Sequence, residues 1–152
     1  MGVSGGCEAA VHATREFLEA MPDGVVIAKL DFCNAFNTIR RSWVLQAVHS
    51  RVPAINKYCC LAYRSPSQLR YGGYMVMSRE GVQQGVPLGP LLFCLTIHPV
   101  LTSLNSEFKI GYLNDILIGG ETVTMSNDVS YLISISEEIG LELNVNKCEL
   151  IS

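Results

Sequence analysis

Residues 109–118 constrain the fold more than any other part of the sequence. Two apolar arms, residues 109–113 and 116–118, meet at the polar dipeptide Asn114-Asp115. Apolar arms around a polar dipeptide predict a β-hairpin, and therefore antiparallel sheet structure. This hairpin holds a carboxylate at the tip of an otherwise apolar unit, with an amide beside it. The tip is therefore the first place to look for chemistry.

Other strands are predicted from apolar runs and glycine turns. Residues 25–32 form an apolar run that ends in Asp31-Phe32, which is typical of a buried strand. Gly72-Gly73 separates residues 68–71 from residues 74–78, a pattern that predicts a second hairpin. Residues 141–151 predict two short strands around Asn146-Lys147.

Helices fill the remaining sequence. Ser42 is a good N-cap for a helix that runs to about Ser50, and Ser126 or Asn127 is one for a helix that Gly140 ends. Three more helices are predicted, over residues 8–21, 53–64 and 87–106. Helices mixed with hairpins predict an α+β fold, with the helices packed on one face of an antiparallel sheet.

Composition limits the kind of protein. The chain has 152 residues, enough for one domain with a core, and its 49% hydrophobic content excludes a disordered chain. The net charge of −3 has the wrong sign for a self-sufficient nucleic-acid binder. Six cysteines without Cys-x-x-Cys spacing indicate reduced, buried thiols in an intracellular protein of the cytoplasm or nucleus, and no zinc site.

A membrane span is the minor reading of the uncharged stretch 81–106. Pro87, Pro90 and Pro99 interrupt it, and no cluster of Lys and Arg flanks it. The stretch therefore fits a buried helix better, and we expect no membrane partner.

Asp31 and Asp115 are the candidates for a metal site. Asp31 ends a predicted buried strand and Asp115 lies at a hairpin tip, so two carboxylates meet if these strands are neighbours in one sheet. Magnesium takes one or two carboxylates together with substrate phosphates, and polymerases use two such ions about 3.5–4 Å apart. The alternative for each aspartate is a simple turn or strand-end residue.

Four segments decide between these readings. They are, in chain order, "AKLDFCNAFNTI", "QQGVPLGPLLF", "YLNDILIG" and "GLELNVNKCEL". Together they resemble four consecutive palm motifs of reverse transcriptases, in particular those of non-LTR (LINE-like) retrotransposons. The resemblance runs from about Gly2 to Ser152, nearly the whole chain, and four motifs in order are far more specific than one.

The resemblance implies a role for several residues. Asp31 matches the first metal-binding aspartate, Asp115 a second, and the Phe32 carbonyl a further ligand of Mg²⁺ or Mn²⁺. Gln84, Gly85 and Pro87 match the loop that contacts template and nucleotide, and Tyr112 begins the motif aromatic-x-Asp-Asp. Two matches have an equally ordinary reading. Phe36 matches the aromatic residue beneath the incoming sugar or is a core Phe, and Lys147 matches a proposed proton donor to pyrophosphate or is a surface Lys.

The main departure from the family is Asn114, which stands where the first hairpin aspartate is normal. An amide oxygen can bind Mg²⁺ but brings no charge, so the site is weakened. We also expect a single palm domain with partial fingers, and no complete fingers, thumb or endonuclease.

Two functional hypotheses follow from these departures. The first is a degenerate fragment of an RNA-directed DNA polymerase, inactive in nucleotidyl transfer, whose family partners are an RNA or DNA template-primer and dNTP. The second is a retained non-catalytic module that binds nucleic acid or protein, for which Asn114 is harmless.

Overall fold

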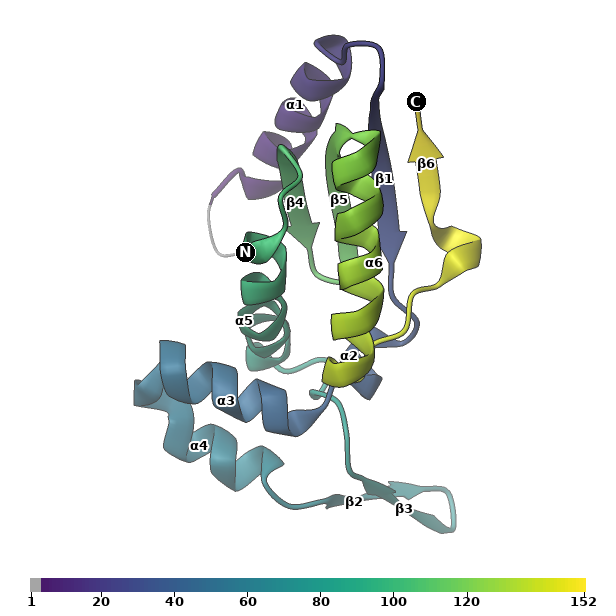
Figure 1. Ribbon diagram of the computed structural model, residues 1–152. Helices are drawn as coiled ribbons and strands as arrows, with labels where there is room; N and C mark the ends of the chain where they lie inside the picture. The colour runs from purple at the N-terminus through teal and green to yellow at the C-terminus, as the bar shows by residue number, and fades with distance from the viewer. Residues whose placement is uncertain (1–3) are drawn as a thin grey trace.

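The structure is a computed structural model that describes residues 4–152. Its helices and strands follow one another along the chain as drawn in Figure 1. The helices are α1 (Gly6–Glu19), α2 (Ala35–Thr38), α3 (Arg41–Arg51), α4 (Pro53–Tyr63), α5 (Leu88–Ser103) and α6 (Thr122–Ile139), with a 3-10 turn, η1 (Val145–Lys147). The strands are β1 (Val25–Asp31), β2 (Ser67–Tyr71), β3 (Tyr74–Ser78), β4 (Phe108–Tyr112), β5 (Asp115–Glu121) and β6 (Glu149–Ile151).

The main sheet has four antiparallel strands in the order β4-β5-β1-β6. Strands β1 and β5 pair along their full length, and the register places Asp31 directly opposite Asp115. The predicted neighbourhood of these two aspartates in one sheet is therefore confirmed. Strand β6 extends the sheet on the other side of β1, from Ile27↔Ile151 to Lys29↔Glu149.

Helices α5 and α6 cover one face of this sheet, with α6 in front of the strands in Figure 1. Ile116 and Ile118 of β5 are fully buried and belong to the same core as Leu132 of α6. Because side chains alternate along a strand, Asp31 and Asp115 point to the opposite face. The predicted α+β fold with an antiparallel sheet is confirmed.

Helix α1 lies on the same face as the two aspartates, which the sequence analysis did not anticipate. Its Phe17 ring stacks on Phe108 of β4, with centroids 4.7 Å apart. Gly119 permits this approach, because a Cβ there would lie 2.7 Å from the Phe17 ring. Helices thus lie on both faces of the main sheet.

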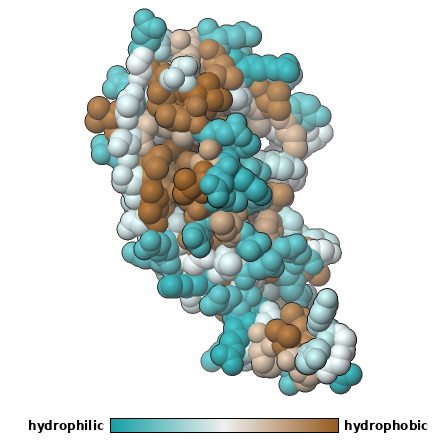
Figure 2. All heavy atoms as spheres, turned by 90° about the vertical axis from the view of Figure 1, so that its right-hand side faces the viewer, coloured by the Kyte–Doolittle hydropathy of each residue, from teal (hydrophilic) through white to brown (hydrophobic). Residues whose placement is uncertain are grey.

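The second sheet is the β2–β3 hairpin, which projects from the lower end of the molecule in Figure 1. Arg41 joins it to the body: this buried side chain donates to the Gly81 carbonyl (2.9 Å) and to the Ser78 carbonyl (3.0 Å). Most of the hairpin is exposed, and apolar side chains gather at the lower end of the molecule in Figure 2.

Some element boundaries differ from the predictions. Ser42 and Ser126 lie inside helices rather than at their N-caps, which are Arg40 and Glu121. Residues 141–151 form one isolated bridge at Leu143, the turn η1 and strand β6 instead of two strands. Of the cysteines, Cys59 is buried and Cys7 is exposed, so the prediction of six buried thiols was wrong. No helix within residues 4–152 has the length and apolar character needed to cross a membrane.

Candidate active site

The β4–β5 hairpin turns through Leu113 and Asn114, because Tyr112 pairs with Asp115. The tip is therefore Leu113-Asn114, one residue earlier than the predicted Asn114-Asp115, and Asp115 is already the first residue of strand β5. Leu113 takes the left-handed conformation with φ 58°, a conformation that is uncommon outside glycine, asparagine and aspartate. This turn presents the Asn114 side chain toward the end of β1.

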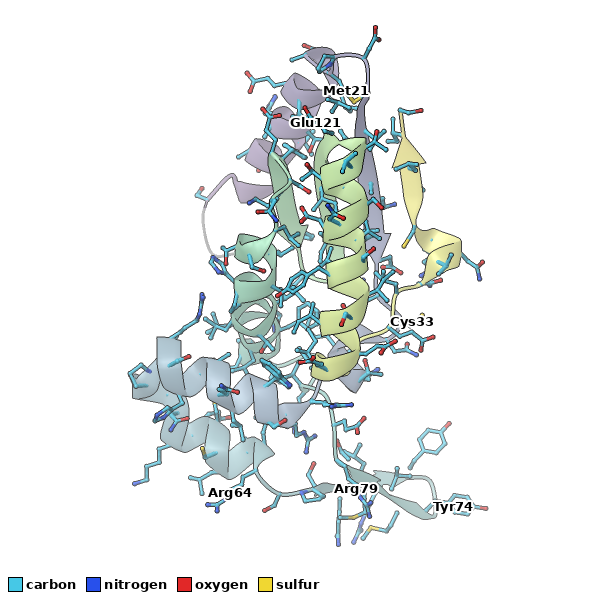
Figure 3. All side chains as sticks on the ribbon, in the orientation of Figure 1. Met21, Cys33, Arg64, Tyr74, Arg79 and Glu121 are labelled. Carbon is cyan, nitrogen blue, oxygen red and sulfur yellow. The ribbon has the colours of Figure 1, made fainter. Side chains whose placement is uncertain are left out.

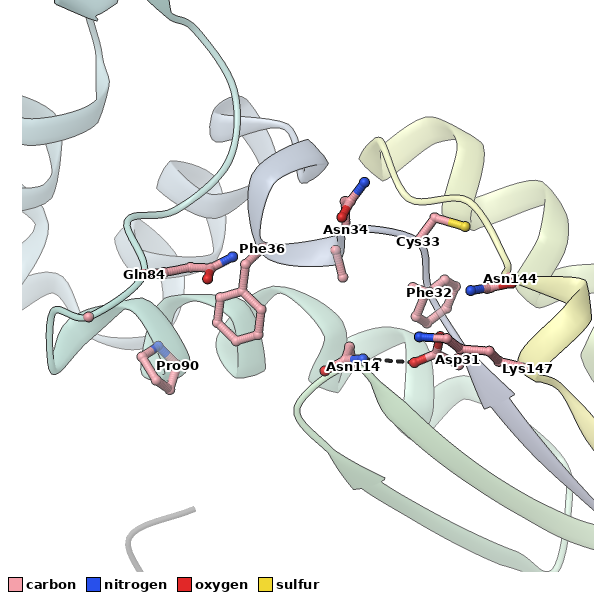
Figure 4. A pocket seen from close by; sticks show the side chains of 12 residues that line it. Asp31, Phe32, Cys33, Asn34, Phe36, Gln84, Pro90, Asn114, Asn144 and Lys147 are labelled. Carbon is pink, nitrogen blue, oxygen red and sulfur yellow. Dashed lines mark hydrogen bonds and ion pairs between the residues drawn. The ribbon is translucent and has the colours of Figure 1, made fainter. Parts of the chain in front are cut away.

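A cavity of about 550 Å³ lies where the hairpin tip meets the end of β1. Figure 4 shows its side chains, which come from four separate parts of the chain. They belong to the end of β1 with the segment after it, the loop before α5 with the first turn of that helix, the hairpin tip, and η1 with the residue before it. The lining residues are Asp31, Phe32, Cys33, Asn34, Ala35, Phe36, Gln84, Gly85, Pro90, Asn114, Asn144 and Lys147.

Asp31 is the acidic group of this cavity and is only 7% exposed. Its Oδ1 accepts a hydrogen bond from Asn114 Nδ2 at 2.9 Å, the contact marked in Figure 4. Its Oδ2 lies 3.9 Å from Lys147 Nζ. Both oxygens of the carboxylate thus face positive or partly positive groups.

The structure brings together most residues that the resemblance selected. Phe36 lines the cavity while its ring stacks on Phe93, at 4.8 Å between centroids, so it is a wall of the cavity and a partly buried core residue at once. Gln84 Nε2 donates to Asn37 Oδ1 at 3.3 Å, which fixes it at the rim. Gly85 beside it has φ 82°, a conformation suited to glycine.

Three selected residues lie outside the set that lines this cavity. Asp115 is half-buried on β5, opposite Asp31 in the register. Tyr112 is 48% exposed and lines an apolar hollow beneath α1 together with Cys7. Pro87 lies at the start of α5, beside Tyr58 in another small hollow.

Asn34 and Asn144 belong to the cavity, although the sequence analysis did not select them. Asn34 follows the end of β1 in the left-handed conformation, φ 45°, which asparagine tolerates. The Asn144 backbone N–H donates to the Asp31 carbonyl at 2.8 Å. Both residues lie within the four quoted segments. Their polar side chains beside apolar residues were the sequence signal that could have selected them.

The donors present do not fit a pair of divalent cations. Asp31 is the carboxylate that lines the cavity, and the remaining polar side chains there are neutral amides and one ammonium. Among residues 4–152, no group of three or more His, Cys, Asp or Glu side chains is placed to hold a metal. Because magnesium sites rely on carboxylates and phosphates, the amide Nδ2 that donates to Asp31 opposes a cation there.

Positive charge is concentrated in a different part of the molecule. Residues 32–79 contain seven Arg and Lys and no Asp or Glu, although the whole chain is acidic. We call this stretch the basic segment. It comprises α2, α3, α4 and the β2–β3 hairpin, and Figure 3 labels Arg64 after α4 and Arg79 on the hairpin side, both in the lower part of the view. Its exposed cations are Arg40, Arg51, Lys57, Arg64, Arg70 and Arg79.

Comparison with known proteins relates nearly the whole chain to retrotransposon proteins. The family model for reverse transcriptase (RNA-dependent DNA polymerase) matches residues 5–152. The chain is 27% identical to the retrotransposable element SLACS 132 kDa protein of Trypanosoma brucei gambiense, over 99% of this chain and 13% of that protein. It is also 27% identical to a Pol polyprotein from the type-1 retrotransposable element R2 of Nasonia vitripennis, over 85% of this chain and 14% of the relative.

Solved structures with this fold include telomerases. That of Candida tropicalis, truncated from its C-terminal domain, matches 95% of this chain and 34% of its own, with a TM-score of 0.68 and 13% identity. That of Candida albicans, in complex with a fragment of telomeric RNA, matches 99% of this chain and 31% of its own, with a TM-score of 0.66 and 12% identity. The chain spans about a seventh of its retrotransposon relatives and about a third of these telomerases. The fold is that of a polymerase palm, and the chain belongs to the reverse transcriptase family.

Proposed function

We propose that this chain is a reverse transcriptase palm, of the kind found in non-LTR retrotransposons, that does not catalyse nucleotidyl transfer. The observation that carries the proposal is the hydrogen bond from Asn114 Nδ2 to Asp31 Oδ1, 2.9 Å long. By resemblance to the family, a carboxylate belongs at position 114 and shares divalent cations with Asp31. An amide that donates to Asp31 takes up a lone pair that a cation needs.

Charge supports the same conclusion. Polymerases of this family use divalent metals, which neutralise charge that develops on the transferred phosphoryl group. With Asn114 in place of a carboxylate, the charged residues that line the cavity are one carboxylate, Asp31, and one ammonium, Lys147. Without metal, the cavity has too little positive charge to bind a triphosphate. Its single lining carboxylate is in turn too little negative charge to bind the metals.

Nucleic-acid binding without catalysis is the second candidate function. The basic segment favours it, because its 48 consecutive residues carry seven cations and no acid, and cations are what bind the phosphate backbone. The two proposals are compatible, since loss of the metal site leaves the basic segment intact.

Primer extension tests the first proposal. The purified chain, given an annealed RNA template and DNA primer, dNTP and millimolar Mg²⁺ or Mn²⁺, is expected to extend no primer above the background of an Asp31→Asn control. Template-dependent incorporation by the parent chain, abolished in that control, refutes the proposal.

Fluorescence anisotropy with a labelled single-stranded RNA tests the second proposal. We expect weak binding that falls steeply as salt rises, because it depends on released counterions. Binding that is unchanged between low and high salt contradicts a role for the basic segment.

A further inference from the structure

The β2–β3 hairpin carries large exposed side chains. Tyr71 and Tyr74 at its turn are 79% and 78% exposed. The apolar side chains further along its strands are about half exposed, and they are Leu69, Met75, Val76 and Met77. Exposed apolar groups that gather in one place mark an interaction site, whereas single ones are ordinary. The residues that line the cavity at Asp31 all lie outside this hairpin, so its surface is separate from the candidate active site.

The two tyrosines form a pair across the turn. The register places Tyr71 directly opposite Tyr74, with Gly72-Gly73 between them. Residues that are directly opposite in an antiparallel pair point to the same face, with Cβ atoms about 4.5–5.5 Å apart. Figure 3 shows Tyr74 at the outer end of the hairpin, away from the body of the molecule. The end of the hairpin therefore holds two neighbouring aromatic side chains that are open to solvent.

Cations accompany these rings along the chain. Arg70 lies beside Tyr71 on the other face of β2, and Arg79 directly follows the end of β3. The carboxylates nearest in the sequence are Asp31 before the hairpin and Glu80 after it. Because the strands of a hairpin lie only about 5 Å apart, a long arginine side chain reaches around its edge. The hairpin thus combines aromatic surface with positive charge.

The size of the hairpin argues against a folded protein as its partner. Each strand has five residues, so one face of the hairpin is about 17 Å long and about 10 Å wide. This is far below the roughly 800 Å² that each partner buries in a stable protein–protein interface. A nucleic-acid base needs only one ring to stack on, and every base has a face that stacks. Positive charge beside the rings complements the phosphates of the same strand.

We propose that Tyr71 and Tyr74 bind single-stranded nucleic acid by stacking on its bases, while Arg70 and Arg79 contact its phosphates. This inference rests on the second candidate function, nucleic-acid binding by the basic segment, and deepens it by naming the form of the ligand. A duplex is a poor ligand, because its bases are stacked on one another and their faces are covered. RNA and DNA single strands share the base faces and the phosphates, so both are expected to bind.

The test is fluorescence anisotropy with three labelled probes. They are an oligouridylate, an oligodeoxyuridylate of the same length, and the oligouridylate annealed to oligoadenylate as a duplex. Tyr71→Ala and Tyr74→Ala each remove one ring, and Tyr74→Phe keeps the ring without its hydroxyl. Tyr58→Ala is the matched control, because Tyr58 is 58% exposed on α4 within the same basic segment. All three tyrosines are more than half exposed, and thermal melting verifies that each variant folds.

Each alanine variant of the hairpin is expected to bind both single strands at least about fivefold more weakly than the parent. The slope of log affinity against log salt concentration should stay the same, because the substitution removes no charge. Tyr74→Phe and Tyr58→Ala should bind like the parent. The duplex should bind more weakly than the single strands and with equal affinity to the parent and the variants.

Three results overturn the inference. The first is equal single-strand affinity in the parent and both hairpin alanine variants, and the second is tighter binding of the duplex. The third is a parent that sediments as a dimer while the alanine variants are monomers, because the hairpin is then a surface for a second copy. Salt-sensitive binding that survives both alanine substitutions refutes the role of the tyrosines alone. A parent without salt-sensitive binding refutes nucleic-acid binding by the basic segment as well, so the two failures are distinguishable.

Discussion

Asn114→Asp is the substitution that most directly tests whether position 114 faces a metal site. It removes the hydrogen bond from Asn114 Nδ2 to Asp31 Oδ1 and places a like charge at the same 2.9 Å contact. Loss of a hydrogen bond to a charged group costs about 1.5–3 kcal/mol. Repulsion between the two carboxylates adds about 1 kcal/mol if water separates them and about 4 kcal/mol at an effective dielectric constant near 20.

The expected destabilisation is about 3 kcal/mol, because Asn114 is half-buried and relaxation of the turn limits the repulsion. For a chain of this size, that corresponds to a fall in Tm of roughly 6–12 °C without metal. A cation that binds only the folded state reverses the loss, by about 2.7 kcal/mol when its concentration is 100 times Kd. Millimolar Mn²⁺ should therefore raise the Tm of the variant and change that of the parent little.

The assay is thermal melting by circular dichroism with EDTA or with Mn²⁺. Asn34→Asp is the matched control, because it adds the same charge to the same cavity at an exposed position. The reasoning predicts a large, metal-reversible loss for Asn114→Asp and a small loss for Asn34→Asp. If both variants melt alike and respond alike to Mn²⁺, Asn114 does not face a metal position and the tip is simply a turn.

Three further predictions concern the rest of the molecule. Asp128 is buried, which by itself raises its pKa, but hydrogen bonds from Ser106 and the Asn105 backbone outweigh burial and lower the pKa. Its stabilisation is therefore complete near neutral pH and is lost as pH falls below about 4, so Asp128→Asn should cost about 2–3 kcal/mol in urea melts at pH 7 and much less at pH 3. Gly81→Ala should cost more than Gly85→Ala in the same melts, because both have positive φ but only at Gly81 does the new Cβ lie 2.5 Å from a backbone oxygen. Replacing Arg64, Arg70 and Arg79 by glutamine should lower RNA affinity and reduce the slope of log affinity against log salt concentration by up to about three. Equal slopes in the parent and the variant refute a role of the basic segment in RNA binding.

The sequence predicted the sheet better than the ends of its helices. Residues 25–32 and the arms around Asn114 are strongly apolar, so these strands followed from pattern, while their pairing rested also on the order of the family motifs. Ser42 and Ser126 are good caps by propensity, yet packing extends both helices past them. Boundaries depend on burial that a local pattern does not contain.

Side-chain grouping was less predictable than strand order. Tyr112 lies within the family motif but points beneath α1, because it shares a sheet face with Phe108, against which α1 packs. Asn144 lies far along the chain and reaches Asp31 only through the return of the chain after α6. Such contacts depend on tertiary packing, and only the named motif suggested where to look.

Asn114 shows why the loss of one carboxylate changes more than the number of metal ligands. An aspartate at this position repels Asp31, and a cation is needed to relieve that repulsion. Asparagine, with nearly the same shape, donates to Asp31 instead and makes the cation unnecessary for stability. Lys147 Nζ lies 3.9 Å from the other oxygen of Asp31, so the metal-free carboxylate also has a positive charge nearby. The fold can thus keep the cavity without metal. The contact between positions 114 and 31, which is repulsive with two carboxylates, is attractive with Asn114 and stabilises the metal-free protein. Asn114→Asp should therefore couple stability to metal again, so that Mn²⁺ raises the Tm of the variant and leaves that of the parent nearly unchanged.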